Sequence, residues 1–149
     1  MATRSVLHES PAYRDVTVGD LLTQLARDFP QNDCLIYPNR GLRYDFSQLE
    51  WISRQIAKGL ITLGVSRGDR VAVWAPNVPE WVVLQFALAK IGAILVTVNT
   101  ALRAVELEYL LSQAEASTLV TVRGFKDLDY VQTLYEIIPE LFPYVRCRA

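Results

Sequence analysis

The pattern of hydrophobic positions divides the chain into two parts, and the first part begins with a helix. Apolar residues recur between residues 18 and 29 with the 3.6-residue period of an amphipathic helix, and Thr17 precedes them as a candidate N-cap. Two strand-like runs follow at 34–37 and 42–44, separated by a turn that contains Gly41. The sequence therefore predicts a helix followed by a β-hairpin.

A second helix is predicted directly after the hairpin. Asp45 with Gln48, or Ser47 with Glu50, forms a capping box at its start. The apolar positions of its expected buried face have helical spacing: Leu49, Ile52, Ile56, Leu60 and Leu63. Gly64 is well placed to end this helix.

From about residue 70 onward, strand-like runs alternate with helical periods. The predicted strands are 70–74, 94–98 and 118–122, and the predicted helices are 78–91, one from about 104, and one carrying apolar residues from Leu128 to Ile138. Asn77 is expected to cap helix 78–91, with Glu80 completing a capping box. Alternation of this kind is typical of a parallel sheet with crossover helices. The predicted fold class is α/β, with helices and a hairpin followed by βαβαβα units.

Helix 78–91 is apolar on nearly all sides, although a helix that covers one face of a sheet needs only one apolar stripe. Two interpretations follow: the helix contacts a partner or a second copy, or it is buried beneath the N-terminal helices of its own chain. The apolar stretch 81–98 is interrupted by Lys90 and Gly92. We therefore interpret it as a helix, a turn and a strand, and predict no membrane span.

Composition and charge narrow the functional classes. A chain of 149 residues that is 51% hydrophobic and 10% aromatic is typical of a compact globular protein. Fifteen Lys and Arg balance sixteen Asp and Glu without long runs, so we expect no nucleic acid partner.

Residues 1–16 are interpreted as a flexible arm without a secretory leader, and Cys34 and Cys147 as thiols of a reduced, cytoplasmic protein. With only His8 besides the two cysteines, no structural zinc site is expected.

The residues that could carry chemistry are few. The seven glycines match neither the dinucleotide fingerprint nor the P-loop, and no serine lies in a nucleophile elbow, so the chain alone is predicted to be non-catalytic. Ligands of parallel sheets gather at the carboxyl ends of strands, which leaves the loops 75–77 and 99–103 as candidates. Asn99 suits a turn, and Arg103 either binds a phosphate or is a solvated residue before a helix. The tryptophans are assigned to the core or an interface.

Four segments, taken in order, resemble the adenylate-forming superfamily of acyl-CoA synthetases, luciferases and peptide-synthetase adenylation domains. Residues 42–49 resemble its first core motif, 68–77 its strand and asparagine turn, 89–99 its second core motif, and 106–111 the helix that follows. The similarity is greatest to the medium-chain acyl-CoA ligases, whose second motif ends in a valine–asparagine pair. Thr97 and Thr100 stand where many members have proline.

The resemblance implies ATP- and magnesium-dependent activation of a carboxylic acid to an acyl-adenylate, followed by thioester formation with coenzyme A. The family's phosphate loop, adenine-binding motif, ribose-binding aspartate and catalytic lysine belong further along the chain than residue 149. The resemblance therefore transfers no catalytic residue and no metal ligand. It places Asn99, Thr100 and Arg103 near the coenzyme A channel, as cofactor-binding candidates.

The leading hypothesis is an N-terminal fragment of a fatty acid–CoA ligase, inactive alone, in which residues 17–149 form an incomplete N-terminal subdomain. Its expected partners are the remainder of the ligase chain and a fatty acid, and such a fragment can self-associate. The alternative is a stand-alone interaction module that binds a partner through helix 78–91. A small nucleotide-binding α/β protein is a third interpretation, disfavoured by the lack of a glycine-rich loop.

Overall fold

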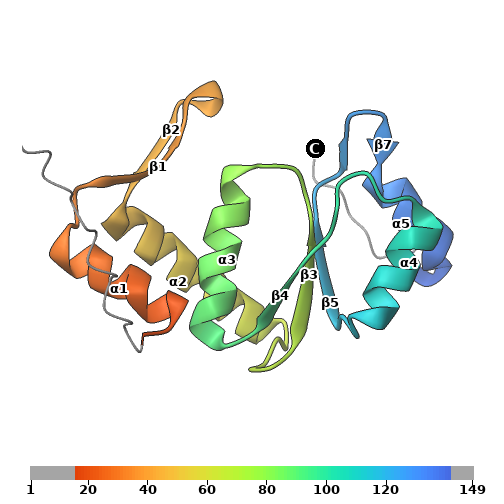
Figure 1. Ribbon diagram of the computed structural model, residues 1–149, viewed down its shortest axis with the longest axis horizontal. Helices are drawn as coiled ribbons and strands as arrows, with labels where there is room; N and C mark the ends of the chain where they lie inside the picture. The colour runs from red at the N-terminus through yellow and green to blue at the C-terminus, as the bar shows by residue number, and fades with distance from the viewer. Residues whose placement is uncertain (1–15, 142–149) are drawn as a thin grey trace, which may run out of the picture.

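The computed structural model of the protein describes residues 16–141 (Figure 1). The helices are α1 (Val18–Asp28), α2 (Phe46–Thr62), α3 (Pro79–Ile91), α4 (Ala104–Gln113) and α5 (Tyr130–Ile137). The strands are β1 (Asp33–Tyr37), β2 (Leu42–Asp45), β3 (Arg70–Trp74), β4 (Ile94–Thr97), β5 (Thr118–Thr121), β6 (Gly124–Phe125) and β7 (Leu128–Asp129). The expected N-terminal arm, His8 and Cys147 fall outside the described residues, except for Val16.

A parallel sheet with the order β4-β3-β5 lies at the centre, which confirms the predicted α/β class. Successive residues of β3 face opposite sides of the sheet. Val71 and Val73 pack in a cluster with α2 and α3, whereas Ala72 and Trp74 pack in a cluster with α4 and α5. Figure 1 shows α3 on one side of the sheet and α4 and α5 on the other. Because both faces of β3 are covered, its sequence is apolar without alternation.

Local signals fix the first helices and the hairpin as predicted. The Thr17 hydroxyl accepts a hydrogen bond from the Asp20 amide at 3.1 Å. The β1–β2 pair is antiparallel, and Gly41 in its turn has a φ of 60°, which favours glycine. Of the two proposed capping boxes, the one formed by Asp45 and Gln48 is present at the start of α2.

The buried face of α2 differs from the expected one. Leu49 and Leu60 are buried, but Ile56 is exposed and Leu63 is 83% exposed. The helix instead buries a side that also contains polar and small residues: Glu50, Ser53 and Ala57. Small side chains let helices approach closely, and Glu50 has an ionic partner on α3, Lys90, so this narrower face packs against α1 and α3.

The predicted N-cap of the third helix was wrong. Helix α3 begins at Pro79, with Val78 as an N-cap that makes no side-chain capping bond, and Asn77 lies outside the helix. Proline is suited to the first helical position because it has no N–H to be capped, and it favours an extended residue before it. The carbonyl of Asn77 instead accepts a hydrogen bond from the Tyr37 hydroxyl, which links this loop to the hairpin.

The last helix also begins later than its apolar period indicated. Residues 124–129 form the β6–β7 hairpin, and α5 starts at Tyr130 with Asp129 as its N-cap. A Cβ added to Gly124 would lie 2.4 Å from the carbonyl oxygen of Leu128, so the hairpin requires glycine there. A two-residue strand is too short to produce a readable hydrophobic period.

Helix α3 is buried by its own chain, which decides between the two interpretations of helix 78–91. Val83 packs in a cluster with Leu22 of α1 and Leu49 of α2. On another side, Leu84 and Leu88 pack with β3. Most of the apolar surface that motivated an interaction module is therefore used within the chain, and the structure gives that alternative no support.

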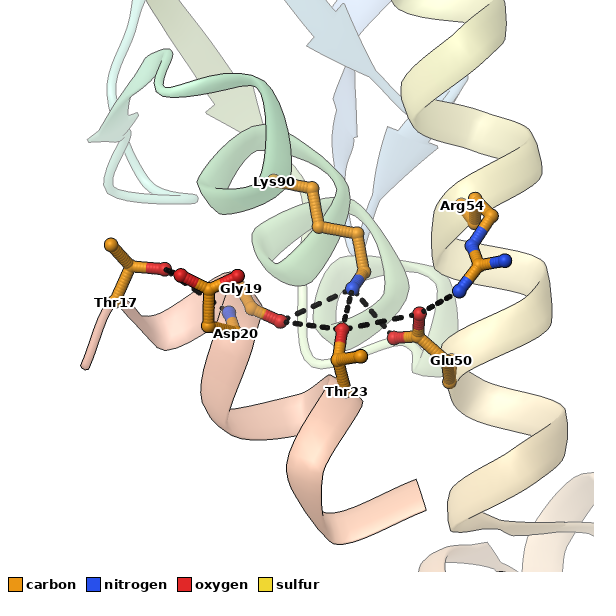
Figure 2. Close-up of polar contacts among 7 residues, drawn as sticks. All are labelled: Thr17, Gly19, Asp20, Thr23, Glu50, Arg54 and Lys90. Carbon is orange, nitrogen blue, oxygen red and sulfur yellow. Dashed lines mark hydrogen bonds and ion pairs between the residues drawn. The ribbon is translucent and has the colours of Figure 1, made fainter. Parts of the chain in front are cut away.

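A buried ionic cluster joins α1, α2 and α3 (Figure 2). Lys90 of α3 pairs with the Glu50 carboxylate of α2 at 2.5 Å, and the two side chains are only 13% and 10% exposed. The Lys90 ammonium also donates to the Gly19 carbonyl at 3.1 Å and to the Thr23 hydroxyl at 3.0 Å, both on α1. Arg54 binds the other oxygen of Glu50 at 2.7 Å. The cluster therefore fixes how the three helices pack together.

Candidate functional site

The candidate site lies where β3 and β4 end, at the carboxyl edge of the sheet. Trp74, the last residue of β3, is fully buried and stacks on Tyr130 of α5 with ring centroids 3.7 Å apart and an interplanar angle of 13°. The indole Nε1 of Trp74 donates to the carbonyl of Asn99 at 3.1 Å. The Tyr130 hydroxyl donates to the carbonyl of Thr100 at 2.8 Å. Two stacked aromatic rings thus hold two consecutive carbonyls of the loop after β4.

The amides of the same loop are paired within it. The Ala101 N–H donates to the Asn99 side-chain oxygen at 3.0 Å, and the Leu102 N–H donates to the Asn99 carbonyl at 3.2 Å. The Arg103 N–H donates to a carboxylate oxygen of Glu106 at 3.0 Å. This arrangement confirms Asn99 as a turn residue that bonds its own backbone. Because these amides are already paired, contacts with a ligand fall to the side chains of the loop.

Arg103 supplies the positive charge of the loop. Its side chain is 65% exposed, and its guanidinium lies 3.4 Å from the carboxylate of Asp127 in the β6–β7 turn. An exposed ion pair of this length contributes little and is screened by salt. The guanidinium can therefore exchange this carboxylate for an anionic ligand at small cost, and its planar fork suits a phosphate.

The three predicted cofactor-binding residues lie together on this loop, but they are not equivalent. Asn99 and Thr100 contribute carbonyls to the aromatic pair, whereas Arg103 directs its guanidinium to the surface. The sequence alone does not reveal Trp74 and Tyr130 as parts of the site. Trp74 was assigned to core or interface, and its burial confirms a core position, whereas Trp51 is 63% exposed.

The second candidate loop, after β3, is held by the hairpin. Arg40 pairs with the Glu80 carboxylate through two contacts of 2.8 and 3.1 Å, and Tyr37 bonds the carbonyl of Asn77. Beside these contacts, an apolar groove of about 280 Å³ is lined by residues from the hairpin, α2 and α3, among them Leu42, Tyr44, Ile52, Ile56 and Val83. The groove explains why Ile56, predicted to be core, is partly exposed.

The described residues hold no arrangement for metal binding or thiol chemistry. Between residues 16 and 141, no three His, Cys, Asp or Glu side chains are grouped so that they could hold a metal ion. Cys34 is a free thiol that donates a hydrogen bond to the Tyr44 carbonyl, with the sulfur 3.3 Å from the oxygen. Burial, with the carboxylates of Asp45 and Asp33 nearby, raises the pKa of this thiol. None of the helices in this part of the chain is long and apolar enough to cross a bilayer.

Comparison with known proteins assigns the family. The family model described as AMP-binding enzyme matches residues 22–143, which is most of the chain. The chain belongs to the AMP-binding enzyme family. The chain is 46% identical over 125 residues to YngI of Bacillus subtilis (strain 168), a candidate acyl-CoA synthetase, with 84% of the chain and 23% of YngI covered.

Two further relatives support the assignment. The mitochondrial medium-chain acyl-CoA ligase ACSF2 of Rattus norvegicus is 38% identical to this chain over 125 residues, covering 84% of the chain and 20% of ACSF2. The crystal structure of the N-terminal domain of FACL13 from Mycobacterium tuberculosis matches with a TM-score of 0.72 and 26% identity, over 86% of this chain and 30% of that one. The chain thus spans about a fifth of the length of the curated relatives it matches.

Proposed function

We propose that this chain is the N-terminal part of an ATP-dependent fatty acid–CoA ligase whose substrates are medium-chain acids. Its match to the AMP-binding enzyme family over residues 22–143 carries the proposal. The names of YngI and ACSF2, an acyl-CoA synthetase and a medium-chain acyl-CoA ligase, support the reaction and the chain length. The acid is joined to AMP with release of pyrophosphate, and the acyl group then passes to the thiol of coenzyme A with release of AMP.

Residues 17–149 are assigned to an incomplete N-terminal subdomain, with residues 1–16 as an arm. The family resemblance places the motifs that hold ATP and magnesium further along a full-length ligase, so the remainder of that ligase is the expected partner of this chain. The apolar groove beside α3 and the hairpin supports a packing partner there. A cytoplasmic location and self-association of the isolated chain stay predictions, and cell fractionation and sedimentation test them.

The proposal is tested first by the native protein and its activity. We expect the native species to be several-fold heavier than 16.8 kDa by intact mass. The purified full-length protein should catalyse ATP–pyrophosphate exchange that depends on a medium-chain acid, and it should form acyl-CoA when coenzyme A is added. A native species of 16.8 kDa, or a full-length protein that forms no acyl-adenylate, would overturn the proposal.

The Asn99–Arg103 loop is proposed to contact coenzyme A through Arg103. In the full-length ligase, Arg103→Ala is expected to raise the KM for coenzyme A by roughly 10- to 150-fold, because a charge-assisted hydrogen bond to a phosphate contributes about 1.5–3 kcal/mol. The ATP–pyrophosphate exchange, which needs no coenzyme A, should stay at the wild-type rate.

Arg67 provides the matched control for Arg103. It is an exposed arginine in the turn before β3, at the opposite end of the sheet. Arg67→Ala should leave the KM for coenzyme A unchanged. Equal effects of the two substitutions, or no effect of either, would remove Arg103 from the coenzyme A site.

A further inference from the structure

We propose that Trp74 and Tyr130 are positioning residues that hold the Asn99–Arg103 loop in its ligand-binding conformation. The inference rests on the proposed function, because it concerns the loop assigned to coenzyme A. Neither aromatic residue lies in that loop: Trp74 ends β3 and Tyr130 begins α5. Their contacts reach the loop from the interior of the molecule.

The geometry places the polar tip of each ring on one loop carbonyl. The rings stack almost parallel at 3.7 Å, so each limits the rotation of the other. The indole N–H donates a hydrogen bond to the carbonyl of Asn99 at 3.1 Å, and the phenol O–H donates one to the carbonyl of Thr100 at 2.8 Å. Two neighbouring peptide planes are thereby fixed, which leaves the loop little freedom between them.

Fixing these carbonyls also fixes the position of the Arg103 backbone. The Asn99 carbonyl that receives the indole N–H also accepts the Leu102 amide, and the Ala101 and Arg103 amides are paired as described above. The loop therefore forms one hydrogen-bonded unit that ends at the first residue before α4. Loss of the Tyr130 hydroxyl loosens this unit, because within residues 16–141 the Thr100 carbonyl makes no other hydrogen bond to the interior.

Tyr130 is itself firmly held, so that it can act as an anchor. Its side chain is fully buried, and its backbone N–H donates to the Arg123 carbonyl at 2.9 Å. Asp129 caps α5 immediately before it by accepting from the Gln132 amide. Burial raises the pKa of the Tyr130 hydroxyl, even though its hydrogen bond to Thr100 acts in the opposite direction. The hydroxyl is therefore a permanent donor at neutral pH.

The test is Tyr130→Phe in the full-length ligase, because this change removes the hydroxyl and keeps the stacked ring. Hydrogen exchange of the Ala101, Leu102 and Arg103 amides should speed up roughly three- to tenfold, the equivalent of one lost hydrogen bond. The KM for coenzyme A should rise by a similar factor, while kcat and the ATP–pyrophosphate exchange should stay near wild type. Tyr109→Phe is the matched control, since Tyr109 is an exposed tyrosine of α4, and it should change neither measurement.

The two readouts separate this inference from the proposed function. Unchanged amide exchange in Tyr130→Phe overturns the positioning role, whatever the enzyme's activity. A raised KM in Arg103→Ala without one in Tyr130→Phe also overturns it. A third outcome is faster amide exchange in Tyr130→Phe with an unchanged KM for coenzyme A in both Tyr130→Phe and Arg103→Ala. It supports loop positioning but shows that the loop does not bind coenzyme A. It therefore contradicts the function proposed for the loop and leaves the proposed ligase activity untouched.

Discussion

Lys90→Met is expected to lower the free energy of unfolding by about 3 kcal/mol. Removing one partner of a buried ion pair typically costs about 3–5 kcal/mol, because the other charge stays buried without compensation. Glu50 keeps Arg54 as a partner at 2.7 Å, which places the expected loss at the lower end. The substitution also removes the hydrogen bonds to Gly19 and Thr23 that attach α1 to α3. Urea unfolding followed by circular dichroism measures the change.

A double-mutant cycle and a surface control make this prediction specific. Lys90→Met combined with Glu50→Gln should cost clearly less than the sum of the single changes, since the second substitution removes the uncompensated charge. Glu115→Gln, which breaks the exposed pair with Arg70, should cost less than about 1 kcal/mol. Additive effects of the two buried substitutions would contradict a coupled pair.

The same cluster predicts a loss of stability in acid. Burial alone would raise the pKa of Glu50, but hydrogen bonds and charge from Lys90 and Arg54 outweigh it and lower the pKa overall. The pKa of this carboxyl in the unfolded chain is about 4.3. The stabilisation from Glu50 is therefore complete above that pH and is lost as the pH falls through the lower pKa of the folded state. Unfolding of Glu50→Gln should depend less on pH in this range than unfolding of the wild type.

Trp74→Ala is expected to cost about 3–5 kcal/mol, the typical range for removing a large aromatic residue from a core. Trp74 is fully buried and is packed among Ala72, Val98 and Leu107, beside its stacking partner Tyr130. Its removal leaves a cavity between the sheet and the α4–α5 layer and deletes the donor to the Asn99 carbonyl. Thermal unfolding should show a lower transition temperature together with faster amide exchange in the 99–103 loop.

Trp51 supplies the control of the same residue type. Because Trp51 is 63% exposed on α2, Trp51→Ala should change the free energy of unfolding far less than Trp74→Ala. Similar losses for the two substitutions would show that the α4–α5 layer packs on β3 more loosely than the structure indicates.

Local chemistry let the sequence alone predict the five helices, the strands β1 to β5 and the fold class. Thr17 and the Asp45–Gln48 pair begin helices because their side chains meet the first free amides. Gly41 and Gly64 adopt positive φ where a turn and a helix end require it. The prediction for Asn77 failed because proline at the first helical position starts the helix without a side-chain cap. The prediction for Leu128 failed because the hairpin that contains it is too short to show a hydrophobic period. The family resemblance came from motif order and needed no structure.

Tertiary structure alone decided which residues act together. The sequence could place Lys90 and Glu50 on helices, but only packing brings their side chains within 2.5 Å and so explains why two charges are buried. It could also propose the Asn99–Arg103 loop from its position after a strand, yet the anchors Trp74 and Tyr130 lie 25 and 30 positions from the carbonyls they bind. Capping and turn signals involve residues only a few positions apart, so they can be recognised in the sequence. Contacts between distant segments depend on how helices and strands pack, so the residues that form them are known only from the folded chain.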